Sequence, residues 1–191
     1  MKYFLRLGFV LLVITTVASG ILAYINSLTE PIIKENQRKA KEEARMEVLP
    51  EAVSFDSISY LNEEVIYAGK NNEGKLAGYT FVASLYGYSS DVKTMVGVTP
   101  DFKVNKIKII EQTETPGLGA NCTKPEFQSL FEGKNETVML VDKDGGEIVS
   151  ITGATITTRT IANSIRTGLK FLRKIEVQSE PEEIHREEVT E

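Results

Sequence analysis

Ser150-Ile151-Thr152-Gly153-Ala154-Thr155-Ile156-Thr157-Thr158 is a hydroxyl-rich turn that leads directly into an amphipathic helix. Beyond it, apolar residues recur at intervals of three and four, so that they share one buried face of a helix over about residues 158–173. These residues are Ile161, Ala162, Ile165, Leu169 and Leu172. Basic side chains gather toward the far end of the same segment, where positive charge suits the helix dipole.

The near end of this helix is a candidate anion site. Its first N–H groups have no partner within the helix and carry partial positive charge, and threonine hydroxyls suit both a helix cap and a position beside an anion. Gly153 turns freely and has no side chain to block a ligand or a modifying enzyme. A phosphate would sit at this end of the helix if the segment binds one. The residues alone favour a plain N-cap in a threonine-rich turn and leave the anion site as the alternative.

Thr152-Gly153-Ala154-Thr155 resembles the Ser/Thr-Gly-Ala-Thr flavinylation motif of FMN-binding domains in two related membrane complexes. These domains belong to the G subunit of the ion-translocating ferredoxin:NAD oxidoreductase (Rnf) and to the C subunit of the sodium-translocating NADH:quinone reductase. The resemblance implies that the FMN phosphate is esterified to Thr155, with Thr157 as a reserve acceptor. It also implies that Thr152, Gly153, Ala154 and Thr158 belong to the cofactor site.

Two upstream segments extend the resemblance. Glu114-Thr115-Pro116-Gly117-Leu118-Gly119 resembles a Glu-Thr-Pro-Gly-Leu-Gly loop of the family, which implies that Glu114, Thr115, Gly117 and Leu118 lie against the flavin. Tyr86-Gly87-Tyr88 resembles its Gly-Tyr-Gly-Gly turn and adds Tyr88 to the site, although Ser89-Ser90 replaces the usual glycine. Without the resemblance, the first segment is a turn set by proline and glycine, or a bare surface loop.

Strand patterns fill the middle of the chain. A period-two alternation rich in β-branched and aromatic residues predicts strands at 65–68, 75–85, 92–99 and 104–111, and their short connecting turns predict an antiparallel sheet. A short helix is expected at 125–131, and a final hairpin pairs 138–141 with 147–151. The turn at 142–146 resembles the start of a calcium loop but lacks the remaining spaced carboxylates. The predicted fold is α+β, with the sheet covered by helices.

An apolar segment opens the chain. Residues 7–25 contain no charge and no proline and are long enough to cross a hydrocarbon core of ~30 Å, which predicts a transmembrane anchor at 1–26. Ala18-Ser19-Gly20 also permits a cleaved signal peptide, but the apolar run continues to Ile25. Thr29-Glu30-Pro31 then predicts a new helix start and Pro50 its stop, so that 27–50 forms a charged stalk helix. A membrane-surface helix is the weaker alternative, because its apolar stripe is thin.

The charge pattern and the resemblance predict opposite sides of the membrane for the globular domain. Lysines and arginines after the span outnumber those before it, and a simple positive-inside count would place the domain in the cytoplasm. The resemblance implies the outer face of the cytoplasmic membrane. We follow the resemblance in predicting a single-pass protein with an extracytoplasmic globular domain at 51–175.

Composition excludes several functions. The chain has 191 residues, a net charge of -5, one cysteine and one histidine, so it cannot build by itself a zinc site, an iron–sulfur cluster, a disulfide or a Cys/His pair. Residues 176–191 hold seven glutamates and one arginine, which predicts an acidic disordered tail or, less favoured, a docking segment. No basic, aromatic-laced face indicates nucleic-acid binding. No dinucleotide fingerprint indicates direct NADH binding.

Together with the apolar anchor, the resemblance implies a membrane-tethered electron carrier of the Rnf complex. FMN attached through Thr155 would pass electrons between other membrane and iron–sulfur subunits, and a separate flavin transferase would attach it. Such a chain is an electron carrier rather than a complete enzyme. The alternative is a membrane-tethered regulatory or assembly module that uses FMN as a ligand or lacks it. The short chain favours the G subunit of Rnf over the C subunit of the quinone reductase.

Overall fold

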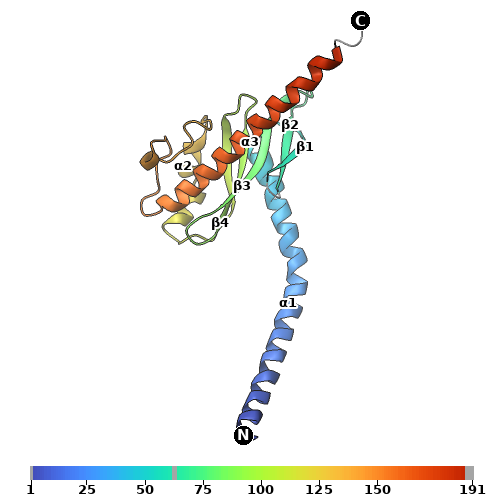
Figure 1. Ribbon diagram of the computed structural model, residues 1–191, viewed down its shortest axis with the longest axis vertical. Coiled ribbons are helices and arrows are strands. Elements are labelled where there is room, and N and C mark those ends of the chain that lie inside the picture. The colour runs from blue at the N-terminus through green and yellow to red at the C-terminus, as the bar shows by residue number, and fades with distance from the viewer. Residues whose placement is uncertain (1, 62–63, 188–191) are drawn as a thin grey trace. The chain divides into compact units, whose positions relative to one another are not determined.

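The computed structural model describes residues 2–61 and 64–187, and the chain divides into two compact units, Met1–Ala40 and Lys41–Glu191. One long helix, α1 (Lys2–Val48), begins in the first unit and ends in the second. The remaining elements, in chain order, are β1 (Ser54–Leu61), β2 (Glu64–Lys70), β3 (Leu76–Tyr86), β4 (Asp91–Val98), β5 (Val104–Glu111), η1 (Gly119–Thr123), α2 (Pro125–Gln128), η2 (Ser129–Phe131), η3 (Asp142–Asp144) and α3 (Thr155–Glu187) (Figure 1).

Helix α1 is continuous where two helices were predicted. Thr29 does not cap a new helix, because its hydroxyl donates back to the carbonyl oxygens of Ile25 at 3.1 Å and Asn26 at 3.3 Å. Pro31 lies inside the helix, which tolerates the loss of one N–H. The predicted stop is close, since α1 ends at Val48. Within the described residues, α1 is the helix long and apolar enough to cross a membrane, and it provides a single-pass anchor.

The second unit is built on a five-stranded antiparallel sheet in the order β1-β2-β3-β4-β5. The four predicted strands are confirmed as β2 to β5. Strand β1 was not predicted, because only Leu61 along its length is buried and a bulge between Ser57 and Ser59 interrupts the alternation. An edge strand of this kind carries little hydrophobic signal.

Helix α3 covers one face of the sheet over β3 and β4 (Figure 1). Its apolar stripe was predicted from spacing, and Ile161, Ile165 and Leu169 are fully buried in the main core with Phe81 of β3. At Gly168 the helix lies close against the sheet, since a Cβ there would lie 2.1 Å from the Phe81 ring. The fold class predicted from sequence, α+β with a helix-covered antiparallel sheet, is confirmed.

This close approach makes a stability prediction. Gly168→Ala forces the Phe81 ring or the helix to move, and we expect a loss of about 1–3 kcal/mol in the free energy of unfolding. Thr167→Ala, on the exposed side of the same helical turn, should change stability by less than about 0.5 kcal/mol. Denaturant titration of the detergent-solubilised chain measures both. Equal stability of the two variants would contradict the packing described here.

The last turns of α1 belong to the second unit and cover the other face of the sheet. Ala44 and Val48 pack on Val82 and Met95. The carbonyl oxygen of Val48 accepts a hydrogen bond of 2.8 Å from the Asn105 side chain. The globular unit therefore begins at Lys41, before the predicted boundary at residue 51, because these turns form part of its core.

The final hairpin predicted at 138–141 and 147–151 is wrong. This segment contains the short helix η3 and a single parallel bridge between Val141 and Ile148. Local hydrogen bonds replace a ladder, because the amides of Asp144 and Gly146 both donate to the Val141 carbonyl. Upstream, the short helix predicted at 125–131 is confirmed as α2 and η2.

Both ends of α3 differ from the prediction. The helix begins at Thr155, three residues before the predicted start, so residues 155–158 form its first turn and 152–154 the turn before it. Its helical backbone continues to Glu187 instead of ending near Arg173, into the segment predicted as an acidic tail. Glutamate is a good helix former, and repulsion between like charges weakens a helix without abolishing it. Residues 188–191 lie outside the described part of the chain.

Candidate functional site

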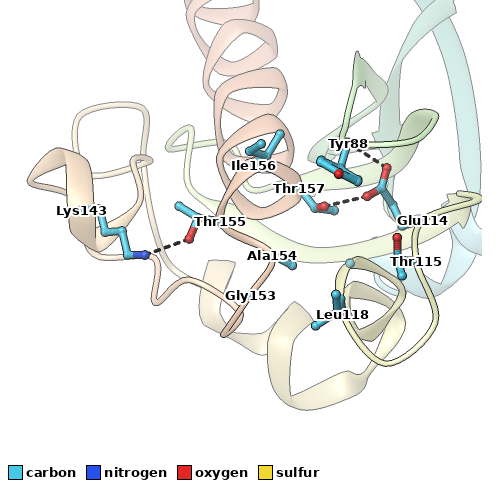
Figure 2. A pocket seen from close by; sticks show the side chains of 11 residues that line it. Tyr88, Glu114, Thr115, Leu118, Lys143, Gly153, Ala154, Thr155, Ile156 and Thr157 are labelled. Carbon is cyan, nitrogen blue, oxygen red and sulfur yellow. Dashed lines mark hydrogen bonds between the residues drawn. The ribbon is translucent and has the colours of Figure 1, made fainter.

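A cavity of about 550 Å³ lies at the N-terminus of α3. Four segments that are far apart in sequence line it: the turn between β3 and β4, the loop after β5, helix η3 and the first turn of α3 (Figure 2). The lining residues are Tyr88, Glu114, Thr115, Leu118, Gly119, Lys143, Gly153, Ala154, Thr155, Ile156 and Thr157.

The turn before α3 is held in shape by its own backbone and by Thr158. Gly153 has a φ of 77°, a left-handed conformation that a side chain would strain. The buried Thr158 hydroxyl donates to the carbonyl of Ala154 at 3.0 Å and accepts the amide of Ile151 at 3.1 Å. Thr158 therefore stabilises the turn before α3 and does not line the cavity.

The two central threonines of the motif have different environments. The hydroxyl of Thr155 is partly exposed in the cavity and accepts a hydrogen bond of 2.9 Å from the ammonium of Lys143. Thr157 is 1% exposed, and its hydroxyl donates to Oε2 of Glu114 at 2.7 Å. An incoming reagent can thus reach Thr155, whereas Thr157 is occupied and covered.

Glu114 joins three of the four segments. Its Oε1 accepts the backbone amide of Tyr88 at 3.0 Å, and its Oε2 accepts the Thr157 hydroxyl (Figure 2). The same Oε1 also accepts the amides of Ser89 at 3.0 Å and Ser90 at 3.3 Å. The carboxylate is almost fully buried, at 5% exposure. Three amides and a hydroxyl aimed at one buried carboxylate indicate that it is ionised, and that it fixes the turn against α3.

Two glycines make room for this carboxylate. A Cβ at Gly87 would lie 2.5 Å from Oε1 of Glu114, and a Cβ at Gly119 would lie 2.6 Å from Oε2. The glycines in the two upstream segments therefore allow the backbone to close around Glu114. This requirement explains the glycine at position 87 and the glycine at position 119, because any larger residue there would meet the Glu114 carboxylate.

The environment of Glu114 predicts how stability depends on pH. Burial disfavours the charged carboxylate, but the amides of Ser89, Ser90 and Tyr88 and the hydroxyl of Thr157 outweigh it, so the pKa of Glu114 lies below its ordinary value of 4.5. A lowered pKa stabilises the fold above about pH 4.5 and stops doing so as pH falls through the folded value.

We therefore expect the stability difference between the natural chain and Glu114→Gln to be constant from neutral pH down to about pH 5 and to shrink below about pH 4.5. Thermal melting of both proteins across this range measures the difference. A difference that stays constant down to pH 3 would contradict an ionised Glu114.

The chemistry of the cavity fits a flavin mononucleotide. At the α3 end, the first N–H groups of the helix and the Lys143 ammonium suit a phosphate. Around the opening, Tyr88, Leu118 and Ile156 are between 43% and 66% exposed and provide apolar surface for a flat ring system. A site with one anion-binding end and apolar walls matches the two parts of this cofactor.

The structure brings together most of the residues predicted for the site. Thr155, Gly153, Ala154, Thr157, Glu114, Thr115, Leu118 and Tyr88 line the cavity. Thr152, Thr158 and Gly117 do not line it. Lys143, Gly119 and Ile156 line it without having been predicted. Gly119 and Ile156 lie inside segments already quoted, but Lys143 lies in the turn interpreted as part of a hairpin, and no sequence signal linked it to Thr155.

The one cysteine of the chain and the possible metal ligands among the described residues indicate no further chemistry at this site. Burial, together with the charge of Glu114, raises the pKa of the Cys122 thiol to about 11, which keeps it protonated at neutral pH. In the described part of the chain, no three histidine, cysteine, aspartate or glutamate side chains gather at one point as metal ligands.

Two family models match the chain. The model described as the FMN-binding domain matches residues 87–170, which include all four segments of the cavity. The model described as the RnfG N-terminal region matches residues 2–48, the whole of α1.

Similar proteins agree with these matches. The G subunit of a Na(+)-translocating ferredoxin:NAD(+) oxidoreductase complex from Acetobacterium woodii is 32% identical, covering 91% of this chain and 94% of the relative. The G subunit of an ion-translocating oxidoreductase complex from Methanosarcina acetivorans is 28% identical, covering 85% and 90%. The crystal structure of the C subunit of the Na(+)-translocating NADH-quinone reductase from Parabacteroides distasonis shares the fold, with a TM-score of 0.54 and 18% identity over 71% of this chain and 91% of that one.

Proposed function

The chain belongs to the G subunits of the Rnf complex, an ion-translocating ferredoxin:NAD oxidoreductase, and on that premise we propose that Thr155 carries FMN through a phosphoester bond. The observation that carries this proposal is the contrast within the threonine motif. Thr155 offers a partly exposed hydroxyl at the N-terminus of α3 beside a lysine ammonium, while Thr157 and Thr158 are buried and hydrogen-bonded.

Attachment is a phosphoryl transfer to the Thr155 hydroxyl. The hydroxyl oxygen forms the new bond to phosphorus, and the phosphoric anhydride bond of an activated flavin nucleotide breaks. The hydroxyl proton passes to a base, and the remaining phosphate fragment departs. Because no described side chain other than Lys143 contacts the Thr155 hydroxyl, we assign the base and the activation to a separate flavin transferase.

A bound flavin would supply reversible electron acceptance, which the residues lining this cavity do not provide. This chain contributes position and environment. The first turn of α3 and Lys143 hold the phosphate end, and Glu114 fixes the turn that presents Tyr88. Tyr88, Leu118 and Ile156 shield the ring from water on the cavity side while leaving it near the surface. A ring held near the surface can exchange electrons with neighbouring membrane and iron–sulfur subunits, which we propose as its partners.

The test is the intact mass of the full-length chain, purified from cells that also express a flavin transferase. The proposal predicts a mass excess equal to FMN less one water, with yellow fluorescence that persists after denaturing electrophoresis. An unmodified mass in the presence of a transferase proven active on another substrate would contradict it.

We propose that the globular unit lies on the extracytoplasmic side of the membrane. The support is family membership, which outweighs the simple charge count around α1. In spheroplasts with intact membranes, added protease should then digest the unit that begins at Lys41. Full protection, lost only when the membrane is lysed, would place the unit in the cytoplasm.

A further inference from the structure

In helix η3, Lys143 lies between Asp142 and Asp144, and each of these aspartates accepts hydrogen bonds from a residue outside the helix. Oδ1 of Asp142 accepts the Ser150 amide at 3.2 Å and its hydroxyl at 2.6 Å. Asp144 pairs with Arg159 through two hydrogen bonds of 2.6 and 2.8 Å. Ser150 and Arg159 lie on either side of the threonine motif. The aspartates thus fasten η3 to both flanks of the motif.

Lys143 is placed against the motif by this arrangement. Its Nζ lies 2.9 Å from Oγ1 of Thr155, and it lines the same cavity (Figure 2). The two adjacent carboxylates accept hydrogen bonds from other donors, Ser150 and Arg159, while the Lys143 ammonium donates to Thr155. The nearby cation Arg159 is committed to Asp144. Lys143 is therefore the cation that the fold directs at the Thr155 hydroxyl.

We propose that Lys143 is a positioning residue for flavin attachment, which binds the phosphate and orients the Thr155 hydroxyl to receive it. This inference rests on the proposed function. The ammonium donates to the hydroxyl oxygen, so the hydroxyl keeps its own proton for a base and cannot rotate freely. Once the ester has formed, the phosphate retains a negative charge beside the ammonium, and a charge-assisted hydrogen bond holds it.

The two parts of this role come from one geometry. A lysine that only shaped the loop would not need to point at the acceptor oxygen, because Asp142 and Asp144 already fasten η3. The charge acts together with the N-terminus of α3, where free N–H groups also favour an anion. The Lys143 ammonium and the N-terminus of α3 would thus both attract the same phosphate.

The experiment compares initial rates of flavin attachment to the full-length chain in membranes, measured by in-gel fluorescence after addition of transferase. Lys143→Met keeps the length of the side chain and removes its charge, and we expect a rate about tenfold lower. Lys143→Arg should restore most of the rate. Lys170→Met removes an exposed lysine elsewhere on α3 and serves as the matched control, with an unchanged rate.

A second readout follows the phosphate itself. The phosphorus NMR resonance of the attached flavin should shift between the natural chain and Lys143→Met, driven to full loading by long incubation, and should not shift in Lys170→Met. If Lys143→Met attaches flavin at the natural rate, if arginine does not rescue it, or if Lys170→Met is equally slow, the inference is wrong. If the natural chain itself takes no flavin, the proposed function fails first, which is a separate result.

Discussion

Replacing Thr155 with valine should remove all covalently bound flavin from a protein that still folds and inserts into the membrane. Valine has nearly the shape of threonine but lacks the acceptor oxygen. The Thr155 side chain is partly exposed, and the one hydrogen bond that it accepts comes from an exposed lysine, so the stability change should be within about 0.5 kcal/mol. In-gel fluorescence and intact mass measure the loss, and thermal melting measures the fold.

Two other threonine variants make this test specific. Thr155→Ser keeps a hydroxyl at the same place and should retain flavin. Thr152→Val alters an exposed hydroxyl of the same motif that does not line the cavity, and it should be loaded normally. Normal loading of Thr155→Val would show that another oxygen receives the phosphate, and the account of the motif would then be wrong.

The largest stability effect at the site is expected at Glu114. Glu114→Ala leaves three backbone amides and the Thr157 hydroxyl without their acceptor, and removes the link between the β3–β4 turn and α3. Since hydrogen bonds to a buried charge are among the strongest in proteins, we expect a loss of about 3 kcal/mol in the free energy of unfolding. Denaturant titration measures it. Flavin attachment should also fall, because Tyr88 and the first turn of α3 lose their fixed positions.

A double-mutant cycle isolates the contact that carries this link. Glu114→Ala and Thr157→Val each remove the hydrogen bond between the carboxylate and the hydroxyl, so their combined effect should be smaller than the sum of the single effects. Strict additivity would mean that the two side chains do not interact in solution. Thr157→Val should still carry flavin on Thr155, which separates the structural threonine from the acceptor.

The parts of the fold that followed from sequence are those with a strong repeating pattern. The stripe of Ile161, Ile165 and Leu169 and the alternation of β2 to β5 depend on burial of one face, which the sequence records directly. Strand β1 buries almost nothing and leaves no such record. The helix start predicted at Thr29 was wrong because capping residues also bond backward within a continuous apolar helix.

The site was predictable where one motif supplied several residues, and not where distant segments meet. Thr155 and Glu114 came from local motifs, and both line the cavity. Lys143 also lines the cavity, but no local motif predicted it. Its position depends on Asp142 and Asp144, which contact residues on both sides of the threonine motif, and no local sequence pattern encodes these contacts.

The central claim is that one oxygen, Oγ1 of Thr155, bears the flavin. Tandem mass spectrometry of the loaded natural chain tests it most directly, because trypsin releases residues 144–159 as one peptide that contains every hydroxyl of the motif. The account predicts a fragment series in which the mass of FMN less water first appears at Thr155. A series that places this mass on Thr152, Thr157 or Thr158, or a peptide without it, would contradict the account.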